Sequence, residues 1–115
     1  MPHLVIECSQ PLSPTLANES AQRTLHDVLL TSGQFGTGDI KVRTHSYDSY
    51  LVAGAQDDFV HVILWLMDGR SDDIKAELSA SIANTVQALI TPAGACQVTV
   101  DVRDMAKATY SKVLI

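Results

Sequence analysis

Short apolar runs alternate with helical repeats along this chain of 115 residues. The first run, His3–Cys8, is rich in β-favouring apolar residues and leads into turn-forming residues, so a strand followed by a loop is predicted. Beyond the loop, Ser13 suits a helix N-cap and Pro14 the first helical position, and apolar residues recur at helical spacing until Gly33. This pattern predicts a first helix over about 14–31.

The next segments predict two strands. Ile40, Val42 and Thr44 alternate with polar, mostly cationic side chains, which indicates an amphipathic strand over 40–45. Phe59–Met67 is a nearly continuous apolar run that has the length of a buried strand.

The remainder of the chain predicts a second helix and a last strand. Apolar residues at helical spacing between Ile74 and Ile90 predict a helix from about 72 to 90, which ends at the turn-forming residues 91–94. Gln97–Arg103 alternates valines with polar residues, which indicates a strand with one solvated or interface face.

The two halves of the chain share a period close to 58 residues. His3 falls on His61 and Val28 on Val86, and the order and spacing of the predicted elements agree better than the residue identities do. We therefore predict a single domain over 1–115 that consists of two tandem β-α-β units. The units are residues 1–57 and 58–115, to within a few positions.

The duplicated pattern also predicts how the elements are arranged. A right-handed crossover makes the strands of each unit parallel and puts both helices on one side of the sheet. The predicted fold is therefore α/β, of the two-layer α+β type, with a four-stranded sheet and two helices on one face. No helix remains to cover the other face of the sheet, which carries polar side chains, so we predict that another copy of the chain covers it in a homo-oligomer. These side chains are Lys41, Arg43, His45, Thr99, Asp101 and Arg103.

Charge and composition narrow the partners and the location. With 8 basic and 13 acidic residues the net charge is −5, so no basic stripe is available for nucleic acid or an anionic membrane. The longest nearly apolar run, Val60–Met67, is far shorter than the roughly 20 residues that span a bilayer. The first cationic residue is Arg23, so the start of the chain does not match a secretory signal, and a cytoplasmic protein is predicted.

No sequence motif indicates a metal or an organic cofactor. The four histidines form no pair at the i and i+4 spacing of a helical metal site. There is no glycine-rich phosphate loop, no Gly-x-Ser-x-Gly motif and no Cys/His spacing of a metal or nucleophile site. The chemistry is therefore expected to need neither metal nor cofactor.

Several short segments stand out as an ordered set that covers nearly the whole chain. They are Met1–His3, Glu7–Ser9, Ile40–Arg43 with His45 and Asp48, Phe59–His61 and Gly69–Ser71. Together with the duplication, this set resembles the 5-carboxymethyl-2-hydroxymuconate Δ-isomerase family of the tautomerase superfamily. The set is more specific to the superfamily than to this one isomerase.

This resemblance implies a trimer of β-α-β-α-β subunits and a catalytic amino-terminal proline, which is exposed when the initiator Met1 is removed. Pro2 would be that proline, and its secondary amine would remove a proton next to a carbonyl and return it elsewhere along the conjugated system. Of the family's two substrate-binding arginines, one matches Arg70 directly. The other falls on Lys41, with Arg43 two residues further on.

A proline base needs a lowered pKa, because an alkyl amine is ordinarily too basic to be free at neutral pH. Burial and nearby cations such as Arg70, Lys41 or Arg43 would lower this pKa, and the same cations would bind carboxylates and stabilise a dienolate oxygen. Lysine lacks the bidentate fork of arginine, so Lys41 and Arg43 remain alternatives for the second substrate contact. Tyr50 is a further candidate for the wall of the pocket.

Arg70 also has a purely structural interpretation. It lies just before a predicted helix, whose free N–H groups favour anions, and this location suits a carboxylate ligand. Asp72 and Asp73 already supply negative charge there, so a surface ion pair with Arg70 is the alternative.

The residues and the resemblance together predict a cofactor-independent isomerase that interconverts keto and enol groups and transposes a C=C bond. Its substrate would be an unsaturated carboxylated 2-hydroxy or 2-oxo acid such as 5-carboxymethyl-2-hydroxymuconate, from the catabolism of aromatic compounds. The alternatives are a related tautomerase with another enol acid as substrate, or a non-catalytic trimeric binding protein on the same scaffold. Lys41 in the place of an arginine supports the last alternative, and so would a retained Met1, because the Pro2 nitrogen would then be an amide.

Overall fold

Four strands and three α-helices are present in the computed structural model, which describes residues 1–115. The strands are β1 (His3–Ser9), β2 (Lys41–Tyr47), β3 (Asp58–Met67) and β4 (Cys96–Met105). The α-helices are α1 (Ser13–Leu16), α2 (Glu19–Thr31) and α3 (Asp72–Leu89). Two short 3-10 helices are η1 (Gln10–Leu12) and η2 (Lys107–Thr109).

The four strands form one mixed sheet in the order β2-β1-β3-β4. β1 is parallel to β2 and β3 is parallel to β4, whereas β1 and β3 are antiparallel. His3 pairs with Lys41 and His61 with Thr99, so both parallel pairs have the same offset of 38 residues (41 − 3 and 99 − 61). The equal offsets confirm the predicted tandem β-α-β units.

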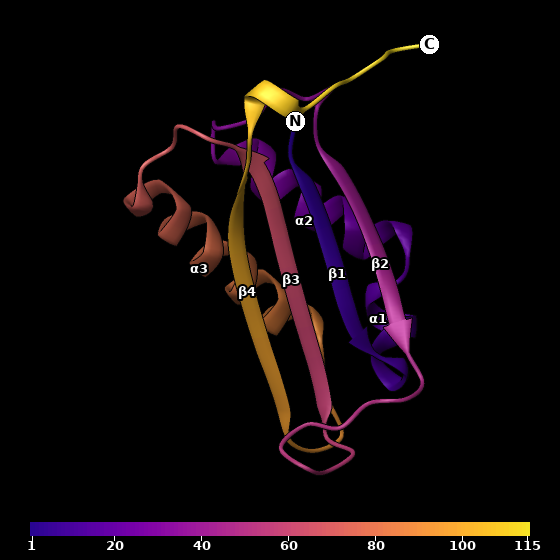
Figure 1. The fold of residues 1–115 in the computed structure, drawn as a ribbon. Coiled ribbons are helices and arrows are strands. Elements are labelled where there is room, and N and C mark those ends of the chain that lie inside the picture. The colour runs from indigo at the N-terminus through magenta and orange to yellow at the C-terminus, as the bar shows by residue number, and fades with distance from the viewer.

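The helices cover one face of the sheet, and the core lies between the two layers (Figure 1). Alternate residues of β1 and β3 point toward the helices, because successive side chains of a strand face opposite sides. The buried apolar residues of these two strands are Leu4, Ile6, Cys8, Val60, Val62, Leu64 and Leu66. They pack against apolar side chains of the helices, mainly Leu25, Leu29, Leu78, Ile82 and Val86. This arrangement confirms the predicted two-layer fold.

The first half contains two helices where one was predicted over 14–31. The helical path is broken at Ala17 and Asn18, and Asn18 has an extended backbone (φ −143°, ψ 162°). Its side-chain oxygen accepts a hydrogen bond from Ala21 N (2.9 Å) as the N-cap of α2. Its amide nitrogen donates to the carbonyls of Pro14 and Thr15, at 2.9 and 3.0 Å. The prediction of a continuous helix was therefore wrong, although its end was predicted correctly.

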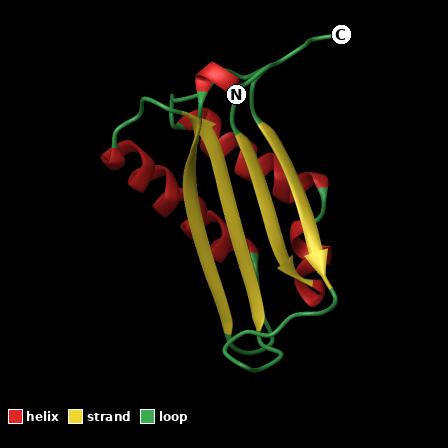
Figure 2. Cartoon of the chain, viewed as in Figure 1, coloured by secondary structure: helices red, strands yellow, loops and turns green.

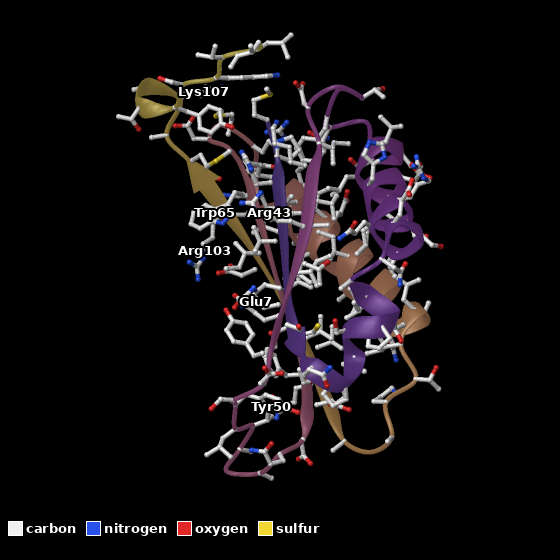
Figure 3. All side chains as sticks on the ribbon, turned by 90° about the vertical axis from the view of Figure 1, so that its right-hand side faces the viewer. Glu7, Arg43, Tyr50, Trp65, Arg103 and Lys107 are labelled. Carbon is white, nitrogen blue, oxygen red and sulfur yellow. The ribbon has the colours of Figure 1, made fainter.

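The opposite face of the sheet carries no helix (Figure 2). Glu7, Trp65 and Arg103 project from this open face, away from the helices (Figure 3). The guanidinium of Arg103 lies over the ring of Trp65, 5.5 Å from its centroid, and its Nε donates to Asp101 at 2.6 Å. Polar and aromatic groups therefore share the open face with the half-buried Val5 and Ile63.

None of the helices has the length and the apolar character that a membrane-spanning helix needs.

Candidate active site

One end of the sheet gathers the amino terminus and segments that are far apart in the sequence (Figure 1). The strands β1 and β2 begin at this end, and β3 and β4 finish there, because the two halves run antiparallel to each other. Pro2 immediately precedes β1, its ring is fully buried, and its carbonyl accepts a hydrogen bond from Lys41 N (3.1 Å). The topology thus brings both predicted strand-two cations to the amino-terminal end.

The cationic side chains of the protein divide into two groups. Four of them pair with carboxylates. Arg23 pairs with Glu19, Lys75 with both Asp72 and Asp104, Arg103 with Asp101, and Lys112 with Asp39. The other four have no carboxylate within ion-pair distance and lie toward the amino-terminal end; we name them the cationic cluster. The cationic cluster consists of Lys41, Arg43, Arg70 and Lys107. Unpaired cations gathered in an acidic protein indicate a site for an anion.

Lys107 joins the cationic cluster from the C-terminal part of the chain. It lies at the same end of the sheet as the amino terminus (Figure 3). Its Nζ is 3.6 Å from the position that a Cβ on Gly69 would occupy, next to Arg70 in the chain. Gly69 has φ +111°, a conformation that favours glycine, and this turn carries the chain from β3 to Arg70.

Arg70 is half-buried and holds the segment that precedes β2. Its Nε donates to Gln34 Oε1 (3.1 Å), its NH2 group to the Gln34 carbonyl (2.7 Å) and its NH1 group to the Met67 carbonyl (3.3 Å). The guanidinium also lies over the ring of Phe35, 4.8 Å from its centroid. The structure forms no ion pair between Arg70 and Asp72 or Asp73, so the surface-pair interpretation was wrong. Three of the five guanidinium N–H groups are engaged, which leaves two for a ligand.

The other two predicted contacts on strand β2 are less constrained. Lys41 Nζ donates only to the carbonyl of Asp39 (3.0 Å). Arg43 is exposed, and its NH1 group lies 3.1 Å from His3 Nδ1. Both side chains thus keep most of their N–H donors for a carboxylate, and the structure brings them together with Pro2 at one end of the sheet.

The electrostatic surroundings disfavour a charged amine at this end. The pKa of the Met1 amine is lowered chiefly by desolvation; Asp39 opposes this shift, and Lys41, Arg70 and Lys112 add to it. The pKa of His3 is also lowered, first by burial and then by Arg43, Lys41 and the amino terminus. Neutral amine and neutral imidazole are therefore both favoured near the cationic cluster.

The C-terminal segment contacts residues at this end of the sheet, which the sequence did not reveal. Tyr110 Oη lies 2.8 Å from His3 Nε2, and Lys112 Nζ lies 3.3 Å from Asp39 Oδ1 and 3.6 Å from Met1 Sδ. The partners are 107, 73 and 111 residues apart in the chain, so no local spacing could have indicated these contacts.

Tyr50 lies at the opposite end of the subunit from the cationic cluster (Figure 3). Its ring contacts Phe59 edge to face, with centroids 5.5 Å apart, and its carbonyl accepts a hydrogen bond from Gln56 Nε2 (2.9 Å). Within one subunit, the structure therefore separates Tyr50 from the other predicted site residues.

The largest surface pocket, of about 470 Å³, lies elsewhere, between the end of α3 and β4. Its lining contains no charged side chain and includes Asn84, Gln87, Ile90, Cys96 and Val98. A carboxylate would find no cation there, so the amino-terminal end is the better candidate for an acidic ligand.

The sequence matches one family of known proteins over nearly its whole length. A family model of 5-carboxymethyl-2-hydroxymuconate isomerases matches residues 2–112. The chain belongs to this family. Its members are isomerases of the tautomerase type, which confirms the resemblance carried by the ordered set of short segments in the sequence. A search of curated proteins found no match.

Solved structures show the same fold. A 5-carboxymethyl-2-hydroxymuconate isomerase from Deinococcus radiodurans R1 has a TM-score of 0.85 at 23% identity, covering 97% of this chain and 88% of that chain. A 5-carboxymethyl-2-hydroxymuconate delta-isomerase has a TM-score of 0.75 at 25% identity, covering 99% and 88%. A protein described as a fused 4-OT wild type symmetric trimer has a TM-score of 0.69 at 18% identity, covering 90% and 87%.

Proposed function

We propose that this protein is a cofactor-independent isomerase that shifts a proton within an unsaturated, carboxylated 2-hydroxy or 2-oxo acid such as 5-carboxymethyl-2-hydroxymuconate. The observation that carries the proposal is the cationic cluster. All four lysines and arginines that lack a carboxylate partner gather at the end of the sheet where Pro2 precedes β1. An acidic substrate would supply the missing partners.

Pro2 acts as the general base once Met1 has been removed. Its secondary amine is then the chain terminus, and burial together with the cationic cluster keeps its pKa low enough for the neutral form at physiological pH. The amine takes a proton from the carbon next to the substrate carbonyl, which produces a dienolate. The protonated amine then returns the proton at another carbon of the conjugated system, and this step moves the double bond.

The cationic cluster binds the substrate and stabilises the dienolate. Lys41 and Arg43 have free donors on the first residues of β2 and hold a carboxylate. Arg70 uses the two N–H groups that Gln34 and Met67 leave free. Positive charge fixed around the oxygen that becomes negative lowers the barrier to proton removal.

We further propose that the protein is a cytoplasmic homotrimer whose subunits bury the open face of the sheet. The half-buried apolar groups on that face, such as Val5, Ile63 and Trp65, support burial against another copy. A Tyr50 that contacts the substrate would then belong to a neighbouring subunit, since Tyr50 and the cationic cluster of the same subunit lie at opposite ends. Light scattering of the purified protein should give three times 12.4 kDa, about 37 kDa; a mass of one subunit would contradict the proposal.

The test of the activity begins with intact mass, which establishes that Met1 is absent from the sample. Isomerisation of 5-carboxymethyl-2-hydroxymuconate is then followed by ultraviolet absorbance. Pro2→Ala should lower kcat/KM by about 100-fold or more, because a positioned general base contributes about that factor. A primary amine remains in this variant, so some activity is expected to persist.

Substitutions of the cations locate the substrate. Lys41→Met and Arg43→Met should each raise KM, whereas Arg23→Gln should not, because Arg23 is paired with Glu19 on α2. Activity on phenylpyruvate enol but not on the muconate would indicate a related tautomerase with another substrate. A protein with a free Pro2 and no activity on any simple enol or dienol acid would be a binding protein, and the proposed isomerase would be refuted.

A further inference from the structure

Three side chains form a hydrogen-bonded chain centred on His3, the residue that follows the proposed base in the sequence. Arg43 NH1 lies 3.1 Å from His3 Nδ1, and His3 Nε2 lies 2.8 Å from Tyr110 Oη. The rings of His3 and Tyr110 meet edge to face, with an interplanar angle of 68° and centroids 6.1 Å apart. β1, β2 and the segment after η2 are distant in the sequence, and together they fix the Tyr110 hydroxyl next to His3, the first residue of β1.

The direction of these hydrogen bonds follows from the chemistry of arginine. A guanidinium has N–H donors and no acceptor, so Arg43 donates and His3 Nδ1 accepts. An imidazole whose Nδ1 accepts is neutral and carries its proton on Nε2. The lowered pKa of His3, caused by burial and the neighbouring cations, agrees with the neutral form. Nε2–H therefore donates to the oxygen of Tyr110.

This direction leaves the hydroxyl hydrogen of Tyr110 outside the hydrogen bond with His3. Since the oxygen is held as an acceptor by His3, its own O–H is not used in that contact, and the side chain has no other hydrogen-bond partner. The reverse direction would require a proton on Nδ1, facing a donor of Arg43, and two donors would then oppose each other. Tyr110 thus has a fixed O–H for which the chain itself supplies no acceptor, at the end of the sheet that carries the cationic cluster.

We propose that Tyr110 is a catalytic residue that donates a hydrogen bond to the substrate oxygen on which negative charge develops, the carbonyl oxygen that becomes the dienolate. This assignment rests on the proposed isomerase function and adds a neutral donor to its cations. The class of ligand is a 2-oxo or 2-hydroxy carboxylate that can form an enolate. His3 is a positioning residue, because it acts only by orienting the hydroxyl.

The contacts around Tyr110 hold its segment in place. Tyr110 follows η2 directly, and its backbone N–H donates to the carbonyl of Lys107 (3.4 Å). Two residues further on, Lys112 binds Asp39 and fastens the same segment to the loop before β2. A donor held on both sides loses little entropy when it meets a substrate oxygen, which is the condition for strong electrostatic stabilisation.

The experiment compares Tyr110→Phe with Tyr47→Phe, both in protein free of Met1. Tyr47 also bears a bonded hydroxyl, which donates to Glu7, but it lies at the far end of β2. Tyr110→Phe should lower kcat by about 100-fold with little change in KM, because the donor acts on charge that forms in the transition state. Tyr47→Phe should retain the wild-type kcat. Equal kcat values for wild type and Tyr110→Phe would overturn the assignment.

A binding measurement separates this assignment from the proposed function. Oxalate is a planar dianion that imitates an enediolate, and its affinity is measurable by calorimetry without turnover. Tyr110→Phe should bind oxalate about tenfold more weakly than wild type, since a hydrogen bond to a charged oxygen is lost. An inactive wild type that binds oxalate in this Tyr110-dependent way would refute only the isomerase. Equal oxalate affinities, or no binding by wild type, would refute the Tyr110 donor.

Discussion

Arg70→Lys should weaken both the fold and the binding of substrate. The change keeps the positive charge but removes the planar fork that reaches Gln34 twice and Met67 once. A lysine ammonium cannot span these acceptors together. The segment that precedes β2 therefore loses its hydrogen-bonded connection to the turn after β3.

The size of the stability effect follows from the three hydrogen bonds. Each bond from a charged donor contributes about 1.5–3 kcal/mol where it is shielded from water. Arg70 is only half-buried, water can reach the freed carbonyls, and lysine restores one bond and part of the contact with Phe35. We therefore expect a loss of about 1–3 kcal/mol in the free energy of unfolding. The two lost substrate contacts should raise KM about tenfold.

Urea unfolding at a fixed subunit concentration measures the stability, and initial rates over a range of substrate concentrations measure KM. Gln34→Ala is the matched control, since it removes one side-chain acceptor of Arg70 at 3.1 Å and keeps the guanidinium with its two hydrogen bonds to backbone carbonyls. It should cost at most about 1 kcal/mol and leave KM unchanged. Wild-type stability in Arg70→Lys would refute the connecting role of Arg70, and a wild-type KM would refute its substrate contact.

Three further predictions concern the amine, the core and the first helix. Lys112 lowers the pKa of the Met1 amine and Asp39 raises it. In protein free of Met1, Lys112→Met should therefore shift the acid limb of the kcat/KM profile to higher pH, because losing the cation and freeing Asp39 both favour the charged form of the Pro2 amine, which must be neutral to act as the proposed base; an unmoved limb would contradict this. Leu64→Ala should cost about 2–5 kcal/mol in urea unfolding, because Leu64 is fully buried in β3. Asn18→Ala should cost about 0.5–2 kcal/mol through loss of the α2 cap, and Asn18→Asp should largely restore it.

Most of the fold could be predicted from the sequence. The repeat predicted the two β-α-β units, and the hydrophobic pattern predicted which faces of the strands and helices are buried. It did not predict the break at Asn18. Ala17, Ala21 and Leu25 keep the helical spacing across that position, so the apolar pattern is the same for one helix or two. What decides the break is the side chain of Asn18, which satisfies backbone groups on both sides of it. A side chain that hydrogen-bonds to the backbone in this way does not change the spacing of apolar residues, so the hydrophobic pattern cannot indicate it.

The candidate site was predicted only as far as the family resemblance reached. Pro2, Lys41, Arg43 and Arg70 lie at one end because the register of β1 and β2 and the turn after β3 place them there. Their catalytic and binding roles stay predictions. The contacts of the C-terminal segment join residues more than 70 positions apart, and only the folded chain defines them.

The equal offset of the two parallel pairs has a consequence for how the halves can diverge. A chain that contains two copies of one unit has a single amino terminus. The position in the second half that corresponds to Pro2 is Val60, which is buried inside β3 and preceded by a peptide bond. The counterparts of Lys41 and Arg43 are Thr99 and Asp101. The second unit therefore has no terminal amine, and each chain can carry the proposed base only once.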